Sequence, residues 1–210
     1  MFKFLAQEYV SQYGFLNLFN FITFRVGASI LTSLFFSLIF GQFIINKLSK
    51  IQPHGQPIRN DGPQTHIIQK AGTPTMGGVL IILSVFSSSV LWSDLYNSFV
   101  WIGLLALISF GFIGIIDDYN KVKSNSSNGL KAITRIILQI VFSLIISLVI
   151  LKMLDDQIDT TISFPFFKNL IINFGYFYLL ISLFILVGSA NAVNLTDGLD
   201  GLAIVPVMIV

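Results

Sequence analysis

Long apolar runs dominate this chain and constrain its fold more than any other feature. Five of them are long enough to cross a membrane, at about 21–45, 75–92, 98–116, 133–151 and 171–190. A spanning helix needs about 20 predominantly apolar residues, whereas a strand of a membrane barrel needs about ten alternating ones. Because the runs are long and continuous, the sequence predicts an all-α, polytopic helical bundle embedded in the lipid bilayer.

The composition agrees with a membrane protein. Only 10% of the 210 residues are charged, against about 25% in soluble domains, and there is no cysteine for a disulfide or a thiolate metal site. A sixth apolar run begins at Leu199 and is still apolar at Val210, which is too short to cross a bilayer. We therefore expect residues 1–210 to form one membrane domain, truncated at its C-terminus, that is the N-terminal part of a longer protein.

Basic residues are distributed unevenly between the two sides of the predicted bundle. The loops after the first, third and fifth spans, at about 46–74, 117–132 and 191–198, must share one side. The first two of these loops and their edges carry eight Lys or Arg residues, whereas the other side carries three Lys. Cytoplasmic loops are enriched in Lys and Arg, so these loops are predicted to be cytoplasmic and the N-terminus to be outside.

Two adjacent acids, Asp117 and Asp118, directly follow the third apolar run. Neighbouring residues of a helix point about 100° apart, so one carboxylate can orient a cation while the other handles a proton. Carboxylate oxygens suit Mg²⁺. Lys121 follows one helical turn after Asp117, where it can neutralise phosphate charge or form a salt bridge with the acid. The plainer alternative is that the acid pair only marks the point where the helix leaves the membrane.

A second polar string, NAVNLTDGLDGLA at 191–203, separates two apolar runs. Asp197 and Asp200 share a face if the string is helical, and the glycines beside them let a substrate approach the backbone. Asn191 and Asn194 have the same spacing and can recognise the amide-like edges of a base. An Asx turn with a helix N-cap is the alternative, although a cap needs one acid rather than two acids and two Asn.

Three motifs in this order, RNDGPQTHIIQKAGTPTMGG, IGIIDDYNK and NAVNLTDGLDGLA, resemble those of the phospho-N-acetylmuramoyl-pentapeptide transferase family. The resemblance extends from about residue 47 to the end of the chain. It implies a bacterial inner-membrane enzyme of about ten spans, usually a homodimer, that uses Mg²⁺. The enzyme would transfer phospho-N-acetylmuramoyl-pentapeptide from its UDP carrier to undecaprenyl phosphate, giving lipid I and UMP. No nucleic-acid partner is expected.

The resemblance also implies a role for each matching residue. Asp117 and Asp118 match the catalytic acid pair and are the candidate metal ligands, and Lys121 matches a lysine that faces the phosphates. The candidate residues of the nucleotide pocket are Lys70, Thr75, Asn191, Asn194, Asp197 and Asp200. The family places a further metal-binding Asp and a His-rich loop in its C-terminal part. A polypeptide of residues 1–210 is therefore expected to be inactive alone.

Two other functions compete with this interpretation. A sister transferase that uses UDP-N-acetylglucosamine shares the acid pair and the DGLDGLA motif, and the first motif favours the peptidoglycan branch. An ion-coupled transporter would place acids near mid-span and contain an inverted repeat. The predicted spans hold almost no ionisable residue, with Arg25 as the main exception. Direct attack by the lipid phosphate and a covalent aspartyl intermediate are both compatible with the motifs.

Overall fold

The computed structural model describes residues 1–53, 55, 72–126, 129–153, 160–163, 167, 170–196 and 202–204. The chain divides into two compact units, Met1–Lys131 and Ala132–Val210, which are described separately. In the described part of the chain, four helices are long and apolar enough to cross a membrane: α2 (Ile22–Ile51), α5 (Ser98–Ser124), α6 (Ala132–Met153) and α7 (Phe177–Thr196). The prediction of an all-α, polytopic membrane protein is confirmed.

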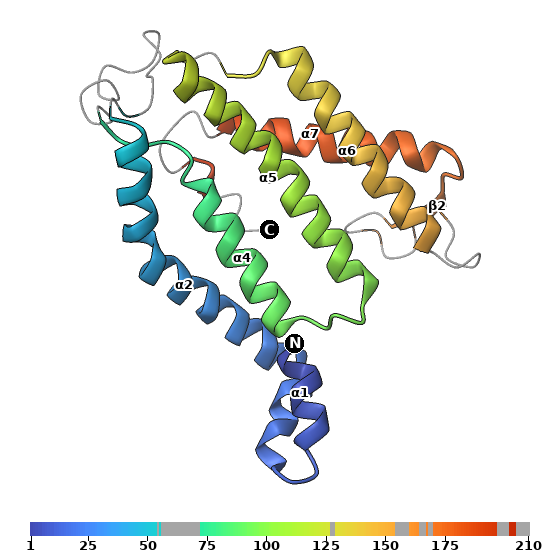
Figure 1. The fold of residues 1–210 in the computed structure, drawn as a ribbon. Helices are drawn as coiled ribbons and strands as arrows, with labels where there is room; N and C mark the ends of the chain where they lie inside the picture. The colour runs from blue at the N-terminus through green and yellow to red at the C-terminus, as the bar shows by residue number, and fades with distance from the viewer. Residues whose placement is uncertain are drawn as a thin grey trace. The chain divides into compact units, whose positions relative to one another are not determined.

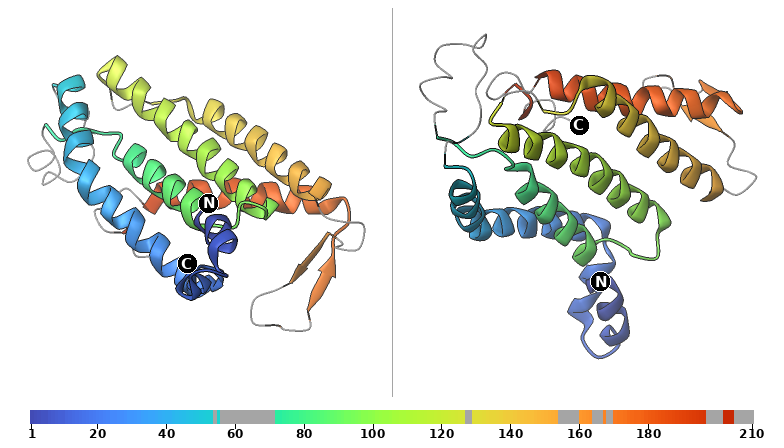
Figure 2. Two further views of the ribbon diagram at one scale, coloured as in Figure 1. Left: turned by 60° about the horizontal axis from the view of Figure 1, so that its bottom comes forward. Right: turned by 45° about the horizontal axis from the view of Figure 1, so that its top comes forward.

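The first unit is a layer of three helices in which α4 (Gly78–Trp92) packs against both α2 and α5 (Figures 1 and 2). Small residues line these contacts. The Ser37 hydroxyl donates a hydrogen bond to the Ser84 hydroxyl at 3.0 Å, and a Cβ on Gly111 would lie 3.2 Å from Cγ1 of Ile82. Close approach through small side chains is how membrane helices commonly pack, so these residues set the spacing of the layer.

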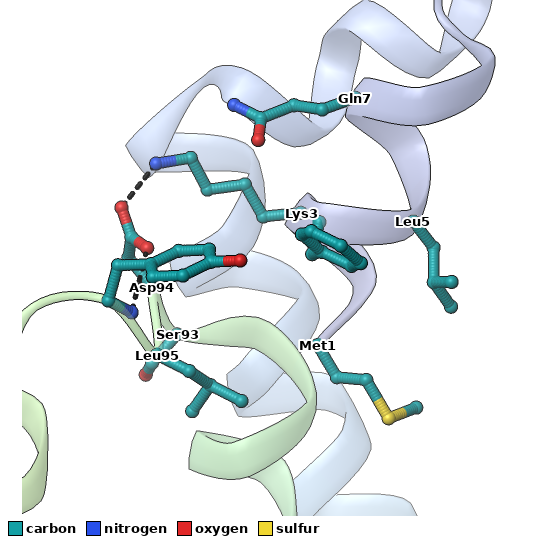
Figure 3. A pocket seen from close by; sticks show the side chains of 9 residues that line it. Met1, Lys3, Leu5, Gln7, Ser93, Asp94 and Leu95 are labelled. Atoms are coloured by element: carbon teal, nitrogen blue, oxygen red, sulfur yellow. Dashed lines mark hydrogen bonds and ion pairs between the residues drawn. The ribbon is translucent and has the colours of Figure 1, made fainter.

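Helix α1 (Phe2–Tyr9) and the 3₁₀ helix η1 (Gly14–Asn20) pack against the end of α4. The ring centroids of Phe2 and Phe19 lie 4.9 and 5.6 Å from that of Trp92. Lys3 pairs with Asp94, and this hydrogen bond holds the pKa of the Asp94 carboxyl below its usual range (Figure 3). These two residues line a cavity of about 260 Å³ at the start of α5.

The C-terminal end of α5 extends beyond the predicted span 98–116. The helix ends at Ser124 because Asn125 adopts a left-handed φ of 47°, and the Asn125 N–H caps carbonyl groups of the last turn. The acid pair therefore lies on a helix and not in the predicted loop 117–132. At 1.5 Å per residue, it is about 30 Å along α5 from the cavity beside Asp94.

The second unit contains α6, a short hairpin and α7. Strands β1 (Thr161–Ser163) and β2 (Ile171–Asn173) pair antiparallel, with Ile162 opposite Ile172. Helices α6 and α7 pack on each other, and the hydroxyls of Ser147 and Ser182 lie 2.7 Å apart in a hydrogen bond.

The fifth apolar run does not form a helix over the predicted 171–190. Its first residues belong to β2, and Gly175 then turns the chain with a φ of +49° while its N–H donates to the Asn173 side chain. Helix α7 begins after this turn and runs on to Thr196. Most of the predicted loop 191–198 is therefore helical. The predicted partial span 199–210 lies largely outside the described residues.

Candidate active site

The two acids lie side by side on α5 but in different surroundings. Ile102, Ser109, Ile113 and Asp117 recur at helical intervals and are all buried, so Asp117 continues the inward face of the helix. Its side chain is 13% exposed, whereas that of Asp118 is 28% exposed. The helical offset between neighbours therefore places one carboxylate inside the unit and the other at its edge.

Lys121 joins the two carboxylates. Its Nζ lies 2.7 Å from Oδ2 of Asp117 and 3.0 Å from Oδ1 of Asp118, at the i,i+4 and i,i+3 spacings that a helix brings together. An ammonium group has three protons, and these two contacts use two of them. The group thus balances part of the acidic charge, and its contacts within the described residues leave one of its protons for an anion.

The backbone that follows α5 folds back onto Asp117. The Leu130 N–H donates a hydrogen bond to Oδ1 of Asp117 at 2.7 Å. Gly129 has no room for a side chain, because a Cβ there would lie 2.7 Å from Cγ and 2.8 Å from Oδ2 of Asp117. Both oxygens of Asp117 therefore accept a hydrogen bond, and its carboxylate is fixed between a helix and a loop.

Asp118 is held from another direction. The Thr75 hydroxyl, in the turn before α4, donates to Oδ2 of Asp118 at 3.0 Å. The backbone of Thr75 is bound in turn by the side chain of Gln52, which follows α2. The structure thus brings together four of the residues that the sequence singled out: Thr75, Asp117, Asp118 and Lys121.

The other predicted residues belong to the second unit or lie outside the described residues. Asn191 lies on α7 in the second unit, where its Nδ2 donates to Oε1 of Gln139 at 2.7 Å and to the Val187 carbonyl at 2.8 Å. Asn194 lies about one turn further along and is exposed. Three further predicted residues, Lys70, Asp197 and Asp200, lie outside the described residues.

The chemistry of the acid pair suits Mg²⁺, which often binds one or two carboxylates together with substrate phosphates. Among the described residues, each of the four carboxylate oxygens accepts one hydrogen bond, which leaves a second lone pair for a cation. Over the described ranges, no group of three or more His, Cys, Asp or Glu side chains could hold a metal ion. These donors are compatible with a cation shared with a phosphate, and Asp118 is the more accessible of the two acids.

Comparison with known families identifies the chain. The sequence profile described as glycosyl transferase family 4 matches residues 100–210, which is more than half of the chain. The chain belongs to this family. The family 4 match includes the acid pair and Lys121. A second, shorter pattern is described as phospho-N-acetylmuramoyl-pentapeptide-transferase signature 1, and it matches residues 70–82, which include Thr75.

Curated proteins resemble the chain over nearly its whole length. A protein of Pelagibacter ubique (strain HTCC1062) is 47% identical over 206 residues, which cover 98% of this chain and 57% of that protein. Proteins of Rickettsia akari (strain Hartford) and Rickettsia prowazekii (strain Madrid E) are each 51% identical over 191 residues, 91% of this chain and 52% of theirs. All three are named phospho-N-acetylmuramoyl-pentapeptide-transferase. The chain thus spans just over half the length of these relatives.

The sequence did not single out three groups of this cluster, which come from Gln52, Gly129 and Leu130. Gln52 is an uncharged residue after an apolar run, and the Leu130 contribution is a backbone N–H, so neither has a signature in the chain. For Gly129 the sequence does offer a signal, because this glycine lies between a polar stretch and the fourth apolar run. Such a glycine often permits close backbone approach, and here it lies against a carboxylate.

Proposed function

We propose that the protein transfers phospho-N-acetylmuramoyl-pentapeptide from its UDP carrier to undecaprenyl phosphate, giving lipid I and UMP. This reaction is the first membrane step of peptidoglycan synthesis. One observation carries the proposal: the hydrogen bond from Thr75 to Asp118 connects residues that belong to two separate sequence matches. Thr75 lies in the pentapeptide-transferase signature and Asp118 in the family 4 profile. Residues from each of the two matches thus meet in one cluster.

The cluster has the groups that phosphoryl transfer needs, which are mainly positioning and charge stabilisation. In this proposal the more exposed Asp118 faces the reacting phosphates and orients the attacking lipid phosphate oxygen. Lys121 stabilises the charge on the transferred phosphate with its remaining proton. Asp117, held by the Leu130 N–H, keeps the Lys121 ammonium in place. The nucleotide pocket is proposed to include Lys70, Thr75, Asn191, Asn194, Asp197 and Asp200.

A transfer assay with two donors tests the proposed function. Full-length protein in detergent, with undecaprenyl phosphate, is expected to release UMP from UDP-N-acetylmuramoyl-pentapeptide and not from UDP-N-acetylglucosamine. Transfer only from the second donor would assign the protein to the sister transferases, and transfer from neither would refute the proposal. A polypeptide limited to residues 1–210 is expected to form no product. It spans just over half the length of the relatives.

We propose Mg²⁺ as the cofactor, held by Asp118 together with substrate phosphates. Mg²⁺ added with the UDP donor is expected to raise the Tm of the full-length protein, because binding to the folded state stabilises it. The increase should be smaller in Asp118→Asn, which has a weaker ligand for a hard cation. Asp94→Asn makes the same chemical change about 30 Å away along α5 and is the matched control. An equal increase in all three proteins would contradict this role for Asp118.

We further propose a homodimer in the bacterial inner membrane, with the acid pair on the cytoplasmic side and the N-terminus outside. The uneven distribution of Lys and Arg supports this orientation. Because residues 1–210 contain no cysteine, single substitutions report accessibility directly. A membrane-impermeant maleimide should label Ser11→Cys in intact spheroplasts and Ser49→Cys only after permeabilisation. The reverse pattern would invert the topology. Crosslinking of the purified protein in detergent tests the dimer.

A further inference from the structure

We propose that Gln52 is a positioning residue for the acid pair, although it touches neither carboxylate. It holds the backbone of Thr75 so that the Thr75 hydroxyl donates to Asp118. This inference rests on the proposed transferase function and adds to it a residue that acts through Thr75. The residues involved are 52, 53 and 55, which follow α2, and 72–77, directly before α4.

The amide of Gln52 forms a two-point contact with the backbone of Thr75. Oε1 of Gln52 accepts a hydrogen bond from the Thr75 N–H at 2.9 Å, and Nε2 of Gln52 donates to the Thr75 carbonyl at 3.4 Å. Gln52 is only 3% exposed, and a buried amide needs hydrogen-bond partners for both its oxygen and its nitrogen. Thr75 supplies both partners. The N–H and the carbonyl of Thr75 belong to the peptide units on either side of its Cα, so the two contacts restrict rotation of the backbone at Thr75, which a single hydrogen bond would not do.

The backbone around this contact is held in an unfavourable conformation. Met76 has a φ of 73°, in the left-handed region that residues with a side chain rarely adopt. Such conformations persist where the surrounding structure fixes them, and they are common at functional sites. The neighbouring segments also touch, because a Cβ on Gly55 would lie 2.6 Å from the Gly72 carbonyl carbon. Gln52 thus holds Thr75, the residue directly before Met76 in this strained turn.

The contact connects the segments next to α2 and α4 to the Asp118 carboxylate on α5. Gln52 follows α2, Thr75 precedes α4, and Asp118 belongs to α5, and hydrogen bonds of 2.9 and 3.0 Å connect the three. If Gln52 loses its polar atoms, the Thr75 turn can relax and its hydroxyl can leave Asp118. The orientation of Asp118 then changes while its charge stays. Such a change should lower kcat more than it alters KM, because orientation matters most in the transition state.

A double-mutant cycle in the full-length protein tests this role. Gln52→Met keeps the length of the side chain without its hydrogen bonds, and Thr75→Val keeps the shape without the hydroxyl. Each is expected to lower kcat roughly tenfold, as expected for loss of a hydrogen bond to a charged group. The double variant should be no slower than Thr75→Val alone, because Gln52 acts through the hydroxyl that is already absent. Gln42→Met, the same change at an exposed position of α2, should leave kcat unchanged.

Each outcome has a defined meaning. Effects of the two substitutions that multiply, or an unchanged kcat in Gln52→Met, would overturn the positioning role and leave the proposed function intact. A wild-type protein that turns over neither UDP donor would refute both. If Gln52→Met does not fold, Gln52→Glu replaces it in the cycle, because it keeps the acceptor for the Thr75 N–H. In that case the variant that combines Gln52→Glu with Thr75→Val is expected to have the same kcat as Thr75→Val alone.

Discussion

Asp118→Asn and Asp117→Asn, each made in the full-length protein, are expected to lower kcat at least about a hundredfold. Asn at 118 keeps the shape of the side chain but removes the charge that pairs with Lys121 and that, in the proposed mechanism, faces the reacting phosphates. Asn at 117 places a hydrogen-bond donor, its NH₂ group, where both neighbouring groups are also hydrogen-bond donors. Whichever way its amide is turned, the NH₂ group meets either the Leu130 N–H or the Lys121 ammonium, both at 2.7 Å from the present oxygens.

The two variants are expected to differ in stability. Asp117 is the more buried acid, so its conflict with Leu130 should lower the Tm, whereas the change at the more exposed Asp118 should leave the Tm nearly unchanged. Asp94→Asn is the matched control for kcat, because Asp94 pairs with Lys3 at the other end of α5. Near-normal turnover in either variant of the acid pair would refute the assignment of that residue. An equal loss in Asp94→Asn would indicate a general effect of removing an acid.

The sequence was sufficient to predict the class of fold and part of the site, for identifiable reasons. Apolar runs of membrane-spanning length leave helices as the simplest solution, and they are present. The acid pair stood out because carboxylates at the edge of an apolar run are costly and therefore rarely accidental. The inward placement of Asp117 was not predicted, because it depends on which face of the apolar helix α5 is buried, and only the structure shows that Asp117 shares this face with Ile113.

The rest depends on contacts that local sequence does not encode. The start of α7 at Phe177 follows from the pairing of Ile171–Asn173 with the preceding strand β1, which no hydropathy pattern reveals. The Leu130 N–H would be the same with almost any residue at that position. Gln52 gains its role only because the turn before α4 lies against the end of α2. Each of these features is a tertiary contact between backbone and another segment.

Gly129→Ala is expected to lower kcat roughly ten- to hundredfold, the effect of losing a hydrogen bond to a charged group. The added Cβ would lie 2.7 Å from Cγ of Asp117, so either the carboxylate or the loop must move. Either movement separates Asp117 from the Leu130 N–H. Among the described glycines, positive φ values occur at Gly55, Gly72 and Gly175, so at Gly129 the cause is steric and not conformational.

The specificity of this effect can be tested on α5 itself. Gly114→Ala is the control, because a Cβ there meets nothing within 4 Å, and its kcat should match that of the wild type. Combined with Asp117→Asn, Gly129→Ala should cause little further loss, since both substitutions act on one carboxylate. A fully multiplicative loss in the double variant would mean that Gly129 serves another part of the protein. A wild-type kcat in Gly129→Ala would mean that the close approach of this loop to Asp117 is not needed for transfer.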